Sequence, residues 1–188
     1  MTSTAPNSLL PVLRGTGHNP PRTLAEALRV AQRQASKLLL RSGQYEAPVD
    51  VDRVCADPKV ELIYTGRLRR VSGACRWVGN RYVITINKRE PVVRQRFTAL
   101  HELKHAIDGA AVTAAVTRLS RPGKRPAEEY VADYFAGCVL MPEPWLIAAI
   151  PHARDLEHLA RYFNVSKEAM RVRLEMLGLD RALARGRV

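Results

Sequence analysis

Hydrophobic residues recur at helical spacing in the first quarter of the chain. Between residues 23 and 42 the apolar positions fall three and four apart, with Thr23 as N-cap and Gly43 as C-cap. The pattern predicts a helix over these residues, followed by a shorter one in VDRVCAD. Residues 1–21 are rich in Pro, Ser, Thr and Gly without a period. They predict a disordered or loosely packed arm.

The pattern changes to one typical of strands between residues 60 and 87. VELIY at 60–64, the stretch at 71–78 and RYVITIN at 81–87 predict three strands. Gly79-Asn80 predicts a hairpin turn between the last two. We expect the third strand to form the edge of the sheet beside a cleft, where it would accept a peptide as a further strand.

The rest of the chain has helical patterns. Pro91 opens a helix that runs to about Asp108-Gly109, and a loop follows at 120–128. EEYVADYFAGCVLM, residues 128–141, predicts the next helix, and residues 156–179 predict two short helices joined by a turn. This order of elements predicts an α+β fold in which a small three-stranded sheet packs on helices.

Composition narrows the class of protein. The hydrophobic content of 46% is ample for a buried core. The sequence has no apolar run of about 18 residues and no segment that reads as a signal peptide, so we expect a cytoplasmic protein. Cys55, Cys75 and Cys138 are scattered and form no CxxC pair, so we expect free thiols.

The net charge of +12 bears on the partners. Such a surface attracts polyanions, either nucleic acid or an acidic protein. The charge alone does not choose between these two, and it also serves solubility.

The strongest chemical pattern is HELKH, His101 to His105. Histidines four residues apart lie on one face of a helix, about 6 Å apart along its axis. Zinc binds such nitrogens at about 2.0–2.1 Å, so both rings can reach one Zn²⁺ ion. Glu102 lies at the edge of the same face, where it can take a proton from a zinc-bound water. The pattern predicts a zinc site with Glu102 as the catalytic base.

A catalytic zinc site requires a third protein ligand. The helix at 128–141 offers Glu129 and, one turn later, Asp133. We predict that Glu129 completes the metal site. Asp133 then accepts a hydrogen bond from a liganding histidine and fixes the tautomer of its ring. The neighbouring Glu128 is the weaker candidate for a ligand.

The two helices together resemble the ImmA/IrrE family of zinc metallopeptidases, which are gluzincin-like. Phe97-Thr98 precedes HELKH, a later helix reads E-x-x-A-D-x-F-A from Glu129, and Leu140-Met141-Pro142 closes it. The resemblance extends over about residues 24–178. It implies a zincin-like metallopeptidase core with a helix-turn-helix-like helical subdomain at its C-terminal side.

Two positions depart from the family pattern. Lys104 stands where the family usually has a glycine, and we expect it either to crowd a neighbouring element or to place a positive charge at the rim of the cleft. Asp133 stands where an asparagine is common. A carboxylate suits the role of accepting a histidine N–H, so this second departure does not argue against activity.

The resemblance also implies a domain organisation and a function. We expect a metallopeptidase domain at 22–150, the helix-turn-helix-like subdomain at 151–179 and a basic tail at 180–188. The implied activity is that of a zinc-dependent endopeptidase that cleaves a cognate helix-turn-helix repressor, often in a mobile element. The sequence identifies neither this repressor nor its scissile bond, the activating signal or the oligomeric state.

A different class of function stays open. The second helix of the helix-turn-helix-like segment carries Lys167, Arg171 and Arg173. The alternative is therefore a non-hydrolytic regulator that uses the same fold to bind DNA or a partner protein, as in a toxin–antitoxin-like or phage system. In the first reading these helices only pack under the metal site and shape the substrate groove.

Two further details are open in the sequence. The group that stabilises the oxyanion has four candidates, which spacing does not separate: Tyr130, Tyr134, His152 and His158. Cys75 precedes the strand beside the cleft, where a thiol would be able to bind the metal and hold the enzyme latent.

Overall fold

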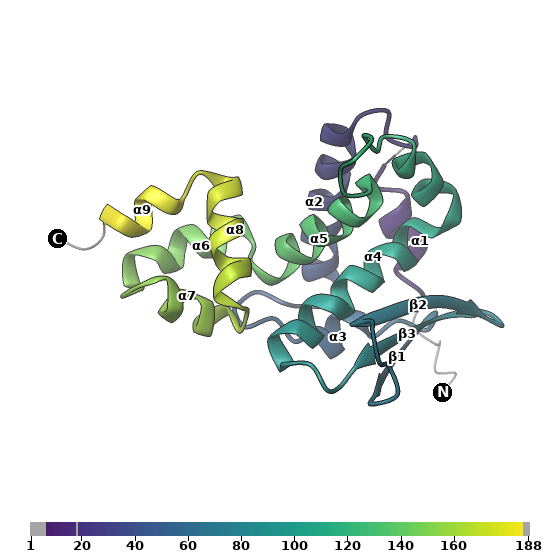
Figure 1. The fold of residues 1–188 in the computed structure, drawn as a ribbon, viewed down its shortest axis with the longest axis horizontal. Helices are drawn as coiled ribbons and strands as arrows, with labels where there is room; N and C mark the ends of the chain where they lie inside the picture. Colours follow the sequence, from purple (N-terminus) through teal and green to yellow (C-terminus); the bar gives the residue numbers. More distant parts are fainter. Residues whose placement is uncertain (1–6, 18, 186–188) are drawn as a thin grey trace, which may run out of the picture.

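Helices and one small sheet make up the fold in the computed structural model, which describes residues 7–17 and 19–185 (Figure 1). The α+β class and the three strands are confirmed. In chain order the elements are α1 Leu10–Arg14, α2 Leu24–Arg41, α3 Val51–Cys55, β1 Val60–Thr65, β2 Gly73–Val78, β3 Arg81–Asn87, α4 Val92–Thr117, α5 Ala127–Leu140, α6 Glu143–Ala149, the 3₁₀ turn η1 Ile150–His152, α7 Leu156–Phe163, α8 Lys167–Leu177 and α9 Asp180–Arg185.

The sheet is mixed, with the strand order β1-β3-β2. β3 runs parallel to β1 and antiparallel to β2, and the predicted hairpin turn lies between β2 and β3. The prediction that RYVITIN forms the edge strand is therefore wrong, because β3 is the central strand and β1 and β2 form the two edges. Burial explains the order, since Ile84 and Ile86 of β3 are fully buried, whereas Trp77 and Val78 of β2 are exposed.

Helix α4 lies between the sheet and the helices α5 and α2 (Figure 1). Its apolar face buries Leu100, Leu103 and Ile107. The helical geometry is interrupted at Gly109, where φ is 62°, and a second helical stretch continues to Thr117. The break falls where the sequence predicts the end of the helix. Gly73 lets β2 approach α4 closely, because a Cβ there would lie 2.5 Å from the Thr98 methyl group.

The segment predicted to be a loose arm contains a packed helix. Leu10 and Leu13 of α1 are buried in the core. The Arg14 guanidinium donates to the carbonyl oxygens of Ile107 at 2.7 Å and of Ala106 at 2.8 Å, next to the break in α4. The prediction is thus wrong for residues 10–14, because composition does not reveal two leucines that gain partners from distant elements. Residues 1–6 and 18 lie outside the described residues.

Helices α6 to α9 gather at one end of the molecule, away from the sheet (Figure 1). Asn164, in the left-handed conformation, turns the chain between α7 and α8, and Ser166 caps α8 through the Ala169 N–H. Two arginines tie this unit to the rest of the chain. Arg96 of α4 donates to the Asn164 carbonyl at 3.1 Å, and Arg173 of α8 donates to the Met141 carbonyl at 3.1 Å.

The predicted basic tail begins with a helix. Residues 180–185 form α9, and residues 186–188 lie outside the described residues. In the part of the chain that the structure describes, no single helix is long and apolar enough to cross a membrane. Two segments, Ala127–Leu140 and Glu143–His152, reach the required length and hydropathy only when they are taken together, and they are bent by 47° relative to each other.

Candidate metal centre

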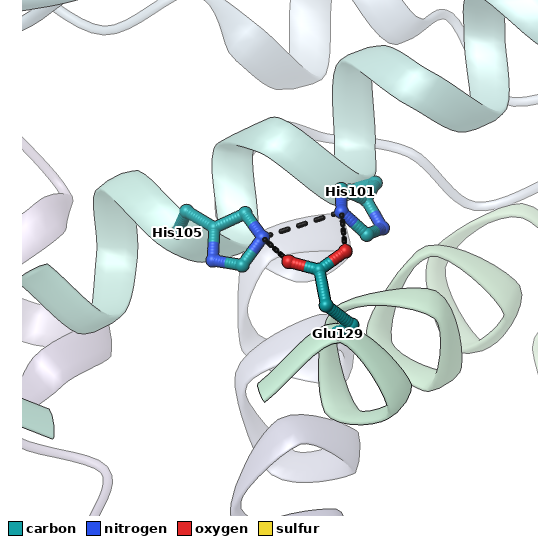
Figure 2. A group of neighbouring side chains, drawn as sticks. All are labelled: His101, His105 and Glu129. Carbon is teal, nitrogen blue, oxygen red and sulfur yellow. Dashed lines mark hydrogen bonds and ion pairs between the residues drawn. The ribbon is translucent and has the colours of Figure 1, made fainter. Parts of the chain in front are cut away.

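Three predicted ligands converge where α4 faces α5 (Figure 2). The Nε2 atoms of His101 and His105 lie 3.2 Å apart. The Glu129 carboxylate lies between the two rings, with one oxygen 3.4 Å from His101 Nε2 and the other 3.4 Å from His105 Nε2. The side chains of the histidines are 13% and 22% exposed, so the site is lined by protein but open to a substrate.

The separations between these atoms test whether a metal fits. In a tetrahedral zinc site with ligand distances of about 2.0–2.1 Å, neighbouring ligand atoms lie about 3.3–3.4 Å apart. The 3.2 Å between the two histidine nitrogens agrees with that spacing, and each of these nitrogens has one Glu129 oxygen at 3.4 Å. The donor set of two imidazoles and one carboxylate is also one that catalytic zinc sites use.

Asp133 lies behind His101 in the predicted position. Its Oδ1 atom is 2.8 Å from His101 Nδ1. Since a carboxylate accepts the Nδ1–H, the lone pair of His101 is left on Nε2, which faces Glu129. Burial opposes ionisation of Asp133, but hydrogen bonds from His101 and Arg125 outweigh it and hold the pKa of this carboxyl below its usual value.

Arg125 belongs to this cluster and was missed by the sequence reasoning. Its guanidinium pairs with Asp133 through Oδ2, the carboxylate oxygen that does not face His101, and lies 3.9 Å from a Glu129 oxygen. The residue lies in the loop before α5, among Arg121, Lys124 and other polar residues. Arg125 lies four residues before Glu129 and eight before Asp133, a spacing that would indicate a shared face if all three were on one helix. Because Arg125 is in a loop, this spacing did not predict the contact.

Glu102 lies between the metal ligands and the edge strand β2. A Cβ placed on Gly73 would lie 3.3 Å from Glu102 Cγ, so the strand passes directly over this side chain. Burial raises the pKa of Glu102, with the His101 charge and a backbone hydrogen bond of Cys75 opposing the shift and Glu129 adding to it. A carboxylate with a raised pKa is a stronger base than one in water.

The free edge of β2 faces this carboxylate. Asn87 N–H donates to the Ser72 carbonyl. From this pair onward, every second residue of β2 is hydrogen-bonded to β3. The backbone N–H and C=O groups of Gly73, Cys75 and Trp77 therefore point away from β3, toward the open edge. The Cys75 N–H is bonded to the Glu102 carboxylate, and the other outward groups are available for a peptide strand beside Glu102.

Comparison with known families identifies the chain. Residues 60–175, more than half of its length, match the model of the family Peptidase_M78, the IrrE N-terminal-like domain. The protein belongs to this family. The matched region includes both metal-site helices and extends through α7 into α8, so the IrrE-like match does not stop at the boundary predicted at residue 150. That boundary stays a prediction.

A solved structure supports the fold of this IrrE-like chain. A Mycobacterium tuberculosis transcriptional regulator matches with a TM-score of 0.58 and 19% sequence identity. The match covers 88% of this chain and 51% of the regulator, so the chain spans about half the length of that protein. No curated protein matches the sequence.

Lys104, the departure from the family pattern, points away from the metal. It is 2% exposed, and its ammonium group pairs with Asp108 one turn later on α4. The expectation of a positive charge at the rim of the cleft is therefore wrong. Lys104 lies about 60° round the helix axis from His101, and its side chain enters the interior, where it pairs with Asp108.

The other histidine ligand has a lowered pKa. Burial is the main cause for His105, and the charge of His101 adds to it, while Glu129 and Asp108 oppose it. A lowered pKa keeps the ring neutral at physiological pH. A neutral imidazole is the form that binds a metal ion.

The remaining candidates separate into two places. Tyr130 and Tyr134 line a groove that also contains Asp133, whereas His152 and His158 line a different pocket with Trp145. The structure therefore does not bring these two histidines to the metal centre.

Cys75 is also outside the ligand group found among the described residues, which consists of His101, His105 and Glu129. Burial, with a smaller contribution from Glu102, raises the pKa of the Cys75 thiol to about 12. This raised pKa favours the protonated thiol in the metal-free site.

Proposed function

We propose that this protein is a zinc-dependent endopeptidase. The observation that carries the proposal is the convergence of His101, His105 and Glu129 at separations that suit zinc, with Glu102 beside them and not among the ligands. A structural zinc site has four protein ligands and no use for a free carboxylate. Membership in a peptidase family agrees with this proposal.

The residues divide the chemistry between them. His101, His105 and Glu129 would hold the zinc ion, which when bound supplies a Lewis acid that polarises the scissile carbonyl. Asp133 keeps His101 in the tautomer that presents Nε2. Glu102 accepts a proton from the attacking water and then donates it to the leaving nitrogen.

The edge of β2 supports a protein substrate. Its outward backbone groups lie beside Glu102 and would pair with an extended peptide, placing a peptide bond over the base. The family resemblance implies a helix-turn-helix repressor as the substrate, and we propose such a repressor encoded near this protein. An open strand edge pairs with an extended segment, so the cleaved site would lie in a part of the repressor that can unfold locally.

Replacement of Glu102 by glutamine tests the proposal. The amide keeps the size of the side chain but accepts no proton. We expect zinc content and the far-UV circular dichroism spectrum to stay at the wild-type level, while cleavage of the co-expressed repressor falls by about 10² or more. The cleavage is read as a shortened band on a gel.

A matched control is Glu128→Gln, a neighbouring carboxylate that does not face the metal ligands. It should cut at the wild-type rate. A Glu102→Gln protein that cuts as fast as the wild type would remove Glu102 as the base, and a wild-type protein that binds zinc and repressor but never cuts would favour the regulator.

The non-hydrolytic alternative has one observation in its favour. Three hydrogen bonds, from Asn87 to Val71 and Ser72 and from Lys88 to Thr65, join two loops at one end of the sheet. These loops carry five exposed cations: Arg67, Arg69, Arg70, Lys88 and Arg89. None of the ion pairs among the described residues involves them. This basic end of the sheet would attract a polyanion whether or not the metal centre is catalytic.

A further inference from the structure

A groove of about 390 Å³ lies beside the metal centre, between the start of α4, the helix α5 and the helix α8. Its walls are mainly apolar, with Phe97, Leu140 and Val172 among the residues that form them. Asp133 and Arg125 line the groove at the side of the metal ligands. The groove therefore adjoins the metal centre on the side of Asp133 and Arg125.

One buried cation in the groove has no counter-charge. Arg173 is 3% exposed, and it forms no ion pair among the described residues. Its Nε atom donates to the Met141 carbonyl at 3.1 Å, and its guanidinium lies over the Tyr134 ring at 5.6 Å. The Nη1 atom is buried without a hydrogen-bond partner. A buried charge of this kind costs free energy unless a partner supplies acceptor atoms.

The other cations of the groove are already paired. Arg94 lies 3.7 Å from Glu90, and Arg125 pairs with Asp133. The one remaining carboxylate of the lining, Glu168, pairs with Arg171 on the surface of α8, at 2.6 Å. Arg173 is therefore the cation of the groove that is left to bind an incoming anion.

We infer that this groove is a substrate subsite that takes an acidic side chain, with Arg173 binding its carboxylate. The apolar walls fit apolar residues that flank the acidic one. This inference deepens the proposed function, since it names the chemistry of the segment to be cut. It assigns Arg173 a role in specificity in addition to its hydrogen bond to Met141.

Peptide binding tests the subsite without cleavage. The probes are the acetylated and amidated tetrapeptides Leu-Glu-Leu-Phe and Leu-Gln-Leu-Phe, which differ by one carboxylate. They are titrated by calorimetry into zinc-loaded Glu102→Gln protein, which keeps the site but does not cut. We expect the acidic peptide to bind about 10- to 100-fold more tightly, the scale of a hydrogen-bonded buried charge.

Two variants, each made in the Glu102→Gln protein, assign the effect to the groove. Arg173→Gln removes the charge and should make the two peptides bind equally. Because that change also affects the hydrogen bond to the Met141 carbonyl, Gly137→Leu serves as a second test of whether the peptides occupy the groove. A Cβ at Gly137 meets Arg173 Cδ at an ordinary contact distance of 3.9 Å, so we expect the leucine to occupy the groove without removing the Arg173 charge. It should weaken both peptides.

A repeat with chelated, metal-free protein shows whether the carboxylate binds the metal instead. The preference for the acidic peptide should persist there. Equal binding of the two peptides to the starting protein, a preference that Arg173→Gln leaves unchanged, or a preference that disappears with the metal would each overturn the inference. None of these outcomes bears on whether Glu102 is the base, because cleavage is not measured.

Discussion

The metal centre and the surface of α8 both combine basic and acidic groups, but they use them in different ways. At the metal centre two imidazoles and a carboxylate point toward one another, within 4.8 Å, and leave their lone pairs directed at a common point. On α8, Arg171 is held between Glu168 at 2.6 Å and Glu175 at 2.5 Å. The ligand atoms of the metal centre therefore face one another and require a cation between them, whereas the charge of Arg171 is already balanced by its two glutamates.

This difference decides where to look for function. Of the three basic residues that made α8 resemble a recognition helix, Arg171 is paired with acidic neighbours and Arg173 is buried. Lys167 alone is left to contact a phosphate, and one contact gives little affinity for DNA. These contacts favour α8 as a wall of the substrate groove.

The largest expected effect comes from breaking the convergence itself. His101→Ala, His105→Ala and Glu129→Ala each remove one of three ligands, so we expect zinc content to fall from close to one per chain to near zero. Metal is measured by mass spectrometry after dialysis. Glu128→Ala, one residue away on α5, is the matched control and should keep its zinc. Full metal in all three ligand variants would show that the ligand set is wrong.

The next effect concerns a pair that is complete but buried. Lys104→Ala leaves the Asp108 carboxylate without its partner, and we expect the free energy of unfolding to fall by about 3–5 kcal/mol, measured by urea denaturation. Lys104→Met combined with Asp108→Leu replaces the pair with apolar groups and should recover most of the loss. If the single variant is as stable as the wild type, the ion pair does not contribute as the buried geometry implies.

A smaller effect is expected at the residue behind the ligands. Asp133→Ala removes the acceptor of the His101 Nδ1–H, which should weaken zinc binding by about 10- to 100-fold in a chelator competition. Asp133→Asn retains an acceptor oxygen and should weaken it less. An alanine variant with wild-type affinity would mean that the hydrogen bond does not orient His101.

The smallest effect is expected on α8. Lys167→Glu with Arg171→Glu should leave zinc content unchanged and should not alter the salt dependence of binding to a short DNA duplex. By contrast, reversing Arg67, Arg69 and Arg70 should lower the slope of log affinity against log salt by about 2–3, close to one for each lost phosphate contact. Loss of DNA binding in the α8 variant alone would restore the recognition-helix interpretation.

Local spacing explains which parts of the site the sequence could predict. His101 and His105 are placed by the period of one helix, and Asp133 follows Glu129 by the same period. The convergence of the two helices was predicted because a catalytic zinc site requires a third protein ligand, which Glu129 offers, and the family resemblance agreed with that prediction. Arg125 could not be predicted in the same way, because its position depends on a loop without a period.

The strand order and the N-terminal helix show the same limit at the level of the fold. Three strands and their hairpin follow from alternation and turn residues. Which strand lies at the edge depends on β3 pairing with both neighbours, and this is a property of burial in three dimensions. The packing of Leu10 and Leu13 likewise depends on partners that are distant in the sequence.

The contacts of Arg14 have a consequence for the biosynthesis of the protein. The carbonyls that it binds belong to residues 92 and 93 positions later in the chain. At a translation rate of about 5–20 residues per second, these partners are made roughly 5–20 s after Arg14. The contact of α1 with α2, through the Gln34 side chain and the Leu13 carbonyl, can therefore form first, and the anchoring of Arg14 at the break in α4 follows only after this interval.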